Sequence, residues 1–166
     1  MKKIVKNIFV GMSSSDDVDN SYKKLAYDIG KILSKTDYHL ILGGNETGLM
    51  KELYLSFTKE RQDVTVIIEN IFKGDNNKYN NQIDFYENCD ILLYLPGGSG
   101  TLYELLSSIN YKVNYGLDYK IIIYNYNGFY DKLIDYFNFL LEEKFNVENP
   151  FIVVNNTFDL EKEIGG

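Results

Sequence analysis

The sequence predicts an α/β fold, a three-layer sandwich in which a mainly parallel sheet carries helices on both faces. Short runs that are apolar throughout alternate with longer segments of helical spacing. Strands of that kind are typical of parallel sheets that are covered on both sides. The length of 166 residues fits one domain, and the 45% hydrophobic share is average for soluble globular proteins. We therefore expect a single domain over residues 1–166.

The expected strands are short runs rich in Ile, Val and Leu, residue types that pack well in buried strands. Each run stops at Gly, Pro, Asn or another polar residue, where a turn is expected. The runs cover residues 4–10, 39–42, 64–68, 90–95, 121–124 and 151–154.

Helices are expected between and after these strands, because apolar residues recur there three or four positions apart. Asp16 or Asp17 is predicted to cap the first helix. The fifth is predicted to turn five apolar side chains inward, namely Leu133, Ile134, Phe137, Leu140 and Leu141. The expected helices cover residues 18–33, 49–57, 83–88, 101–115, 130–145 and 158–164.

Charge and hydropathy narrow the possible partners. The net charge is −7, and an acidic chain lacks the basic face that nucleic-acid binding requires, so we expect no nucleic-acid partner. No apolar run reaches the ~18–20 residues of a membrane span, so we expect no membrane association. The absence of an export signal and the single cysteine favour the cytoplasm.

Three residue types that often carry chemistry occur once each. Cys89 alone cannot form an intrachain disulfide, and Cys89 with His39 cannot build a tetrahedral Cys/His zinc site, so no metal is expected. Arg61 is the single arginine. Chemistry that needs an arginine clamp on phosphate must use Arg61 or proceed without one.

The carboxyl ends of the strands near residues 10, 42 and 95 should meet at one edge of the sheet, where ligands bind in such folds. The strongest loop there is Pro96-Gly97-Gly98-Ser99-Gly100-Thr101. Its glycines permit close backbone approach, and the N–H groups of the following helix would face the loop and favour a phosphate. A plain strand-to-helix turn is the alternative. Glu104, one turn on, could engage the ligand or simply favour the helix start.

Two further loops are expected to form the opposing wall. One contains Gly43, Gly44 and Asn45, and the other contains Ser13 and Ser14. Neither loop carries the Gly-Lys-Ser/Thr ending of a Walker loop or the GxGxxG pattern of dinucleotide folds. The ligand class therefore stays open at this point.

The loop at residues 96–101, together with Glu104, resembles the PGGxGTxxE motif of the LOG family, whose members are often labelled lysine decarboxylase-like. The order and spacing of other segments agree with that family over nearly the whole chain. These segments are Tyr22 to Leu33 with Ala26, Ile29 and Gly30; Gly43-Gly44 with Gly48-Leu49-Met50; and Tyr124-Asn125 with Gly128-Phe129-Tyr130.

The resemblance implies a Rossmann-like homodimer with its site near the subunit interface. It also implies a phosphoribohydrolase that cleaves AMP or N6-modified AMP to a free base and ribose 5-phosphate, without metal or organic cofactor. By this resemblance the loop from Gly97 to Thr101 holds the 5′-phosphate. Glu104 engages the ribose and supports an oxocarbenium-like transition state.

This sequence departs from the family at an Arg-Lys pair, whose positions fall on Asn81 and Gln82. Losing one charge-stabilising group typically costs ~10²–10³ in rate. Three readings stay open. Lys73, Lys78 or Arg61 of either subunit could replace the missing cation. The site could bind a nucleotide without cleaving it, as a sensor or a carrier, including a carrier of molybdenum cofactor. Asn81 and Gln82 could instead bind a different ligand through hydrogen bonds. Phe85 and Tyr86 are candidates for stacking on a purine.

Overall fold

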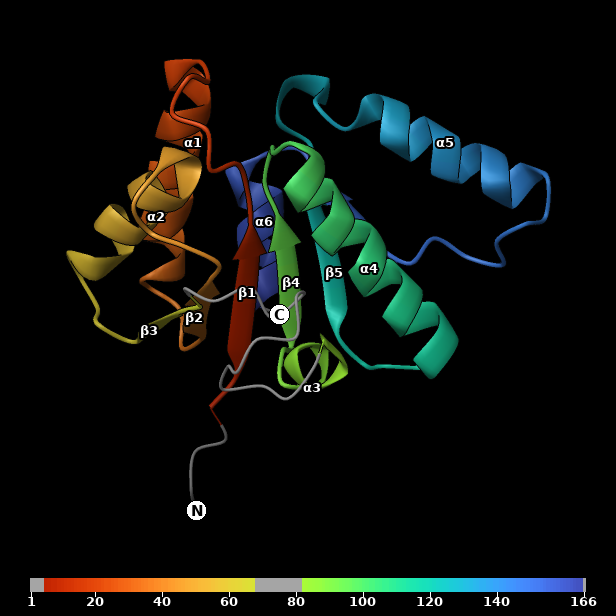
Figure 1. Ribbon diagram of the computed structural model, residues 1–166, viewed down its shortest axis with the longest axis horizontal. Helices are drawn as coiled ribbons and strands as arrows, with labels where there is room; N and C mark the ends of the chain where they lie inside the picture. The colour runs from red at the N-terminus through yellow and green to blue at the C-terminus, as the bar shows by residue number, and fades with distance from the viewer. Residues whose placement is uncertain (1–4, 68–81, 166) are drawn as a thin grey trace.

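Six parallel strands form one sheet in the order β3-β2-β1-β4-β5-β6 (Figure 1). The computed structural model describes residues 5–67 and 82–165, with only the backbone at residues 82–84. The expected α/β fold with a parallel sheet is confirmed. The strands are β1 (Asn7–Gly11), β2 (His39–Leu42), β3 (Val64–Val66), β4 (Ile91–Tyr94), β5 (Lys120–Tyr124) and β6 (Ile152–Val154).

Helices cover both faces of the sheet, as expected. One apolar cluster joins one face to α1, α2 and α6, and a second cluster joins the other face to α3, α4 and α5. The side chains of successive strand residues alternate between the two faces of the sheet, so that Val10 packs in the first cluster and Phe9 in the second. The helices are α1 (Asn20–Leu33), α2 (Gly48–Thr58), α3 (Gln82–Glu87), α4 (Ser99–Tyr115), α5 (Asp131–Glu142) and α6 (Thr157–Gly165), with a 3₁₀ turn η2 (Tyr126–Gly128) after β5.

The strand order reverses direction between β1 and β4, which lie side by side in the middle of the sheet (Figure 1). From β1 the chain proceeds outward to β2 and β3, and from β4 it proceeds outward to β5 and β6. Loops that leave β1 and β4 therefore diverge to opposite sides and open a crevice above the carboxyl ends of these strands, as in other doubly wound sheets.

One local expectation is wrong, and another is met in part. Asp19, rather than Asp16 or Asp17, caps α1, because its carboxylate accepts a hydrogen bond from the Ser21 backbone N–H at 2.8 Å. In α5 only Phe137 is fully buried. The other four expected inward residues are half-buried, and two of them, Leu133 and Ile134, pack against the second apolar cluster as predicted; the remaining two are Leu140 and Leu141.

Candidate functional site

A pocket of about 350 Å³ lies where the loops after β1, β2 and β4 meet. This is the edge of the sheet that the strand pattern predicted. The lining residues are Phe9, Val10, Gly11, Met12, Ser13, Ser14, Ser15, Gly43, Met50, Gly98, Ser99, Gly100, Thr101 and Glu104.

Among the helices that follow β1, β2 and β4, α1 has a side-chain cap on its N-cap residue, whereas the N-cap residues of α2 and α4 make no such hydrogen bond. The first amides of α1 are covered by Asp19. In α2 the Gly48 N–H donates to the Asp16 carboxylate at 2.8 Å, and the Leu49 N–H donates to the Ser13 carbonyl at 3.0 Å. The first residues of α4 instead line the pocket, so this is where unsatisfied N–H groups and the positive end of a helix dipole meet open space.

Backbone contacts hold the three loops together. The Ser13 N–H donates to the Pro96 carbonyl at 3.1 Å, which joins the loop after β1 to the loop after β4. Gly48 joins the loops after β1 and β2, and its φ of +58° is a conformation that glycine adopts readily. A Cβ at Gly48 would also lie 2.5 Å from the Ser14 carbonyl carbon. The pocket wall is therefore fixed by main-chain packing.

Glu104 brings the one carboxylate that lines this pocket among the described residues. It stands three residues after Thr101 in α4, and its side chain is largely withdrawn from water. This burial raises the pKa of Glu104 from 4.5 to about 7, because the charged form loses hydration. Near neutral pH the group is therefore present in both protonation states, as acid–base chemistry requires.

The structure brings most of the predicted site residues together. Ser13, Ser14, Gly43, Glu104 and the segment from Gly98 to Thr101 line the pocket. Gly97 lies behind that segment, with no room for a Cβ beside the Thr101 side chain. Gly44 and Asn45 follow Gly43 in the same loop and do not line the pocket. Asn81 falls outside the described residues, and Gln82 begins α3 with only its backbone described.

Six lining residues were not among the predicted site residues. Phe9, Val10 and Gly11 belong to β1, Met12 and Ser15 belong to the loop after it, and Met50 belongs to the first turn of α2. Only Gly11 carried a usable signal, because it ends an apolar strand at the expected ligand-binding edge. Met12 and Met50 resemble ordinary core residues in the sequence.

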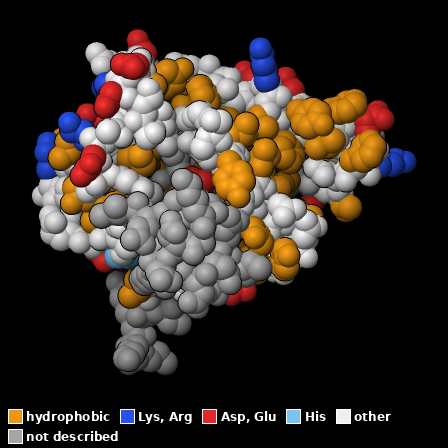
Figure 2. All heavy atoms as spheres, viewed as in Figure 1, with side chains coloured by type: hydrophobic (Ala, Val, Ile, Leu, Met, Phe, Trp, Pro, Cys, Tyr) orange, Lys and Arg blue, Asp and Glu red, His pale blue; other side chains and the backbone are white. Residues whose placement is uncertain are grey.

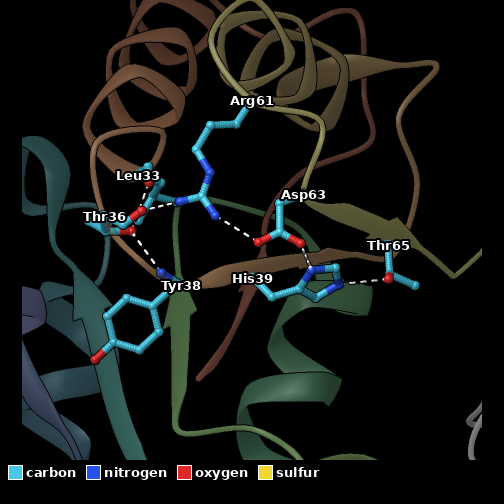
Figure 3. A network of polar contacts seen from close by, with 7 residues as sticks. All are labelled: Leu33, Thr36, Tyr38, His39, Arg61, Asp63 and Thr65. Atoms are coloured by element: carbon cyan, nitrogen blue, oxygen red, sulfur yellow. Dashed lines mark hydrogen bonds and ion pairs between the residues drawn. The ribbon is translucent and has the colours of Figure 1, made fainter. Parts of the chain in front are cut away.

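No lysine or arginine among the described residues lines the pocket. Arg61 lies before β3, at the amino ends of the strands, and forms the network in Figure 3. Its guanidinium donates to the Thr36 carbonyl and to the Asp63 carboxylate, the latter at 2.7 Å. Arg61 therefore cannot replace the missing cation within its own chain. Lys73 and Lys78 fall outside the described residues.

His39 belongs to the same network and binds two partners. Its Nδ1 lies 2.5 Å from the Asp63 carboxylate and its Nε2 lies 2.7 Å from the Thr65 hydroxyl (Figure 3). Asp63 and Thr65 flank the start of β3, the edge strand. The hydrogen bond from His39 is the main reason why the pKa of Asp63 is lowered. His39 thus joins β3 to β2, at the opposite end of the sheet from the pocket.

Phe85 and Tyr86 do not line the pocket, so the expectation that they stack on a purine is wrong. Both side chains are fully buried beneath α4, in the core of the second layer. The Phe85 ring packs edge-on against Phe9 with centroids 5.2 Å apart. Because both rings pack in the core, neither ring face is accessible to a ligand.

The strand order β3-β2-β1-β4-β5-β6 with helices on both faces defines a Rossmann-type α/β protein, with a pocket at the switch point of its sheet. A family model described as "Possible lysine decarboxylase" matches residues 39–162, well over half of the chain. The chain belongs to this family, which is the LOG-like family that its glycine loop resembles. Among the described residues no helix is both long and apolar enough to cross a membrane.

Curated relatives agree with this assignment. "Cytokinin riboside 5'-monophosphate phosphoribohydrolase LOG1" of Arabidopsis thaliana is 27% identical over 151 residues, which are 83% of this chain and 70% of that protein. The chain spans 61% to 76% of the lengths of such relatives.

Solved structures of the same fold include molybdenum cofactor proteins. The molybdenum cofactor carrier protein of Chlamydomonas reinhardtii superposes with a TM-score of 0.68 at 14% identity, over 98% of this chain and 97% of that one. The molybdenum cofactor binding protein of Rippkaea orientalis gives 0.62 at 16% identity, over 99% and 100%. At these identities the likeness shows the fold.

Proposed function

We propose that this protein binds a nucleoside 5′-monophosphate and hydrolyses the N-glycosidic bond of AMP or N6-modified AMP to a free base and ribose 5-phosphate. The observation that carries the proposal is the uncapped start of α4, which opens into a pocket that also contains the Glu104 carboxyl. The LOG relatives support the substrate class. The protein acts in the cytoplasm, as one domain over residues 1–166, and requires no metal or organic cofactor.

The phosphate is proposed to lie on the amides of Ser99, Gly100 and Thr101, where the helix dipole favours an anion. The Ser13 and Ser14 hydroxyls and Gly43 form the opposing wall. The ribose then extends toward Glu104, whose ionised carboxylate stabilises positive charge at C1′ as the bond to the base breaks. Water adds at C1′, and the base leaves with a proton.

The phosphate seat can be tested at Gly100, where an added side chain meets no atom within 4 Å. Gly100→Asp places a carboxylate at the open helix start, where it stabilises the helix and repels an anion. Gly100→Asn is the matched neutral control. We expect calorimetry to show AMP binding to the native protein and to the Asn variant, and its loss in the Asp variant. Equal AMP affinity in the two variants would argue against this seat.

Hydrolysis is tested by incubating the protein with AMP and N6-substituted AMP and separating any free base by chromatography. Glu104→Gln retains the shape of the side chain and removes its charge, so we expect base release to fall ~10²-fold or more. Absence of free base with the native protein, or equal release by Glu104→Ala, would refute the hydrolase proposal.

A second function is binding of a nucleotide or another phosphoribosyl ligand without cleavage, as a sensor or a carrier similar to the molybdenum cofactor carriers. Two observations favour it: no Lys or Arg of the described residues lines the pocket, and the carriers share the fold. Tight calorimetric binding of AMP, or of molybdenum cofactor, without release of base would support this function over hydrolysis.

A homodimer is also proposed, through the outer face of α4. Leu102, Tyr103, Leu106 and Val113 are 38%, 53%, 40% and 64% exposed. Figure 2 shows hydrophobic side chains gathered over α4 and α5. Exposed apolar patches of this kind mark protein–protein interfaces. We expect sedimentation to give a dimer for the native protein and a monomer for Leu106→Glu, and a native monomer would contradict the proposal.

A further inference from the structure

The carboxyl of Glu104 and the ring of Tyr94 both lie against Gly11, the last residue of β1. Gly11 pairs in register with Tyr94 on the neighbouring strand β4, on the face of the sheet that α4 covers. A Cβ at Gly11 would lie 2.7 Å from ring carbon Cδ1 of Tyr94 and 3.1 Å from Oε2 of Glu104. Only the missing side chain of glycine lets both groups come this close to the strand.

The backbone of Glu104 is held as well as its side chain. The Tyr94 hydroxyl lies 3.1 Å from the Glu104 carbonyl oxygen, and the Tyr86 hydroxyl lies 3.3 Å from the same oxygen. Both tyrosines are fully buried, one on β4 and one on α3. The second turn of α4 is thus bonded to two elements of the core at the residue whose carboxyl lines the pocket.

We infer that Gly11 and Tyr94 are positioning residues, which together hold the Glu104 carboxyl against the end of β1 inside the pocket. Gly11 provides the space, and Tyr94 fixes the turn of α4 from which the side chain extends. The purpose of this placement, a carboxyl aimed at a bound sugar, rests on the proposed function. The placement itself needs no ligand and can be measured without one.

The environment of Glu104 makes its titration a sensitive measure of its position. The ionisable groups packed around it are the Tyr94 and Tyr86 phenols, whose pKa values burial raises far above neutral. No described Lys, Arg or second carboxylate lines the pocket. Burial alone raises the pKa of Glu104 to about 7, so any movement of the carboxyl toward water lowers that value.

The test compares two tyrosines with similar structural roles. Tyr94→Phe removes the hydroxyl that lies 3.1 Å from the Glu104 carbonyl oxygen and 3.1 Å from the Ser108 hydroxyl. Tyr119→Phe is the matched control, because the buried Tyr119 hydroxyl donates to the carbonyl of Ser108 in the same helix at 2.5 Å. Gly11→Ala is the third variant. ¹³C NMR follows the Glu104 carboxyl, identified by the signal that disappears in Glu104→Gln.

We expect the pKa of Glu104 to stay at about 7 in Tyr119→Phe and to fall toward 4.5 in Tyr94→Phe and Gly11→Ala. A purely structural role for Tyr94 predicts the same titration in both Phe variants, and that result overturns the inference. If Gly11→Ala fails to fold, the comparison of Tyr94→Phe with Tyr119→Phe still tests the inference.

Calorimetry with AMP on the native protein separates this inference from the proposed function. If the pKa of Glu104 falls in Tyr94→Phe and Gly11→Ala but the native protein binds no AMP, the proposed function is refuted and the positioning roles remain supported. If the native protein binds AMP and releases base but Glu104 titrates identically in Tyr94→Phe and Tyr119→Phe, the proposed function is supported and the positioning roles are refuted.

Discussion

Glu104→Gln should make the protein more stable at alkaline pH, even though it removes a group from the proposed active site. Burial raises the pKa of Glu104 from 4.5 to about 7, so the folded protein holds this proton more tightly than the unfolded chain does. The contribution of Glu104 to stability is therefore fully present below pH ~4.5 and is lost as the pH rises through about 7. At 1.36 kcal/mol per pKa unit, the complete loss is about 3 kcal/mol.

Glutamine does not titrate, so the difference between the two proteins isolates this one group. From pH 5 to pH 8.5 the free energy of unfolding of the native protein should fall by about 2–3 kcal/mol relative to that of Glu104→Gln. Urea unfolding at pH 5, 6, 7, 8 and 8.5 measures it. This range ends below the titration of the buried tyrosines, whose pKa values are raised above 10.

Parallel stability curves for the two proteins over this pH range would show that the Glu104 carboxyl is fully hydrated. The reasoning from burial would then be refuted, and with it the assignment of Glu104 as a group that titrates near neutrality. A curve of the opposite slope would mean that an unrecognised cation stabilises the ionised form.

Three further predictions follow from the same structure. If Glu104 acts as an ionised carboxylate, base release from AMP should increase with pH through about 7; a rate that falls over that range would assign Glu104 as the acid instead. Arg61→Lys should lower the free energy of unfolding by about 1–2 kcal/mol, because one ammonium group cannot donate to both the Thr36 carbonyl and the Asp63 carboxylate. The affinity for AMP should stay unchanged, and weaker AMP binding at unchanged stability would reassign Arg61 to the site. Gly30→Ala should cost about 1–3 kcal/mol in thermal or urea unfolding, since its Cβ would lie 2.5 Å from the Leu53 carbonyl oxygen of α2; Gly165→Ala, with no atom within 4 Å, is the control, and equal stability of the two variants would contradict this packing.

The sequence predicted the layers and the site edge because both depend on local patterns. Apolar runs such as the one at Leu40–Leu42 identify buried strands, and glycine loops after three such strands indicate where a ligand fits. The predicted start of α4 at Thr101 was two residues late, because Ser99 and Gly100 already adopt helical geometry. Helix boundaries that are predicted from local sequence patterns commonly differ by one or two residues from those in the structure.

The contacts that shape the pocket depend on strand register, which no single segment contains. Gly11 and Tyr94 become neighbours because β1 pairs with β4, 83 positions further along the chain. The roles of Asp16 and Arg61 were hidden for the same reason. Asp16 looked like a helix cap and instead bonds to Gly48 in the next loop, while Arg61 looked available and is bonded to Thr36 and Asp63.

The network around Arg61 changes how chemical labelling of this protein should be interpreted. Dicarbonyl reagents that modify guanidinium groups are a common way to reveal an anion site, because inactivation that a substrate prevents is taken to mark an arginine within it. Here the reagent has one target in the whole chain, and that target holds Asp63 and Thr36 at the amino ends of the strands. Inactivation by such a reagent would therefore not by itself place an arginine in the pocket, because the modification would also break the contacts of Arg61 with Thr36 and Asp63.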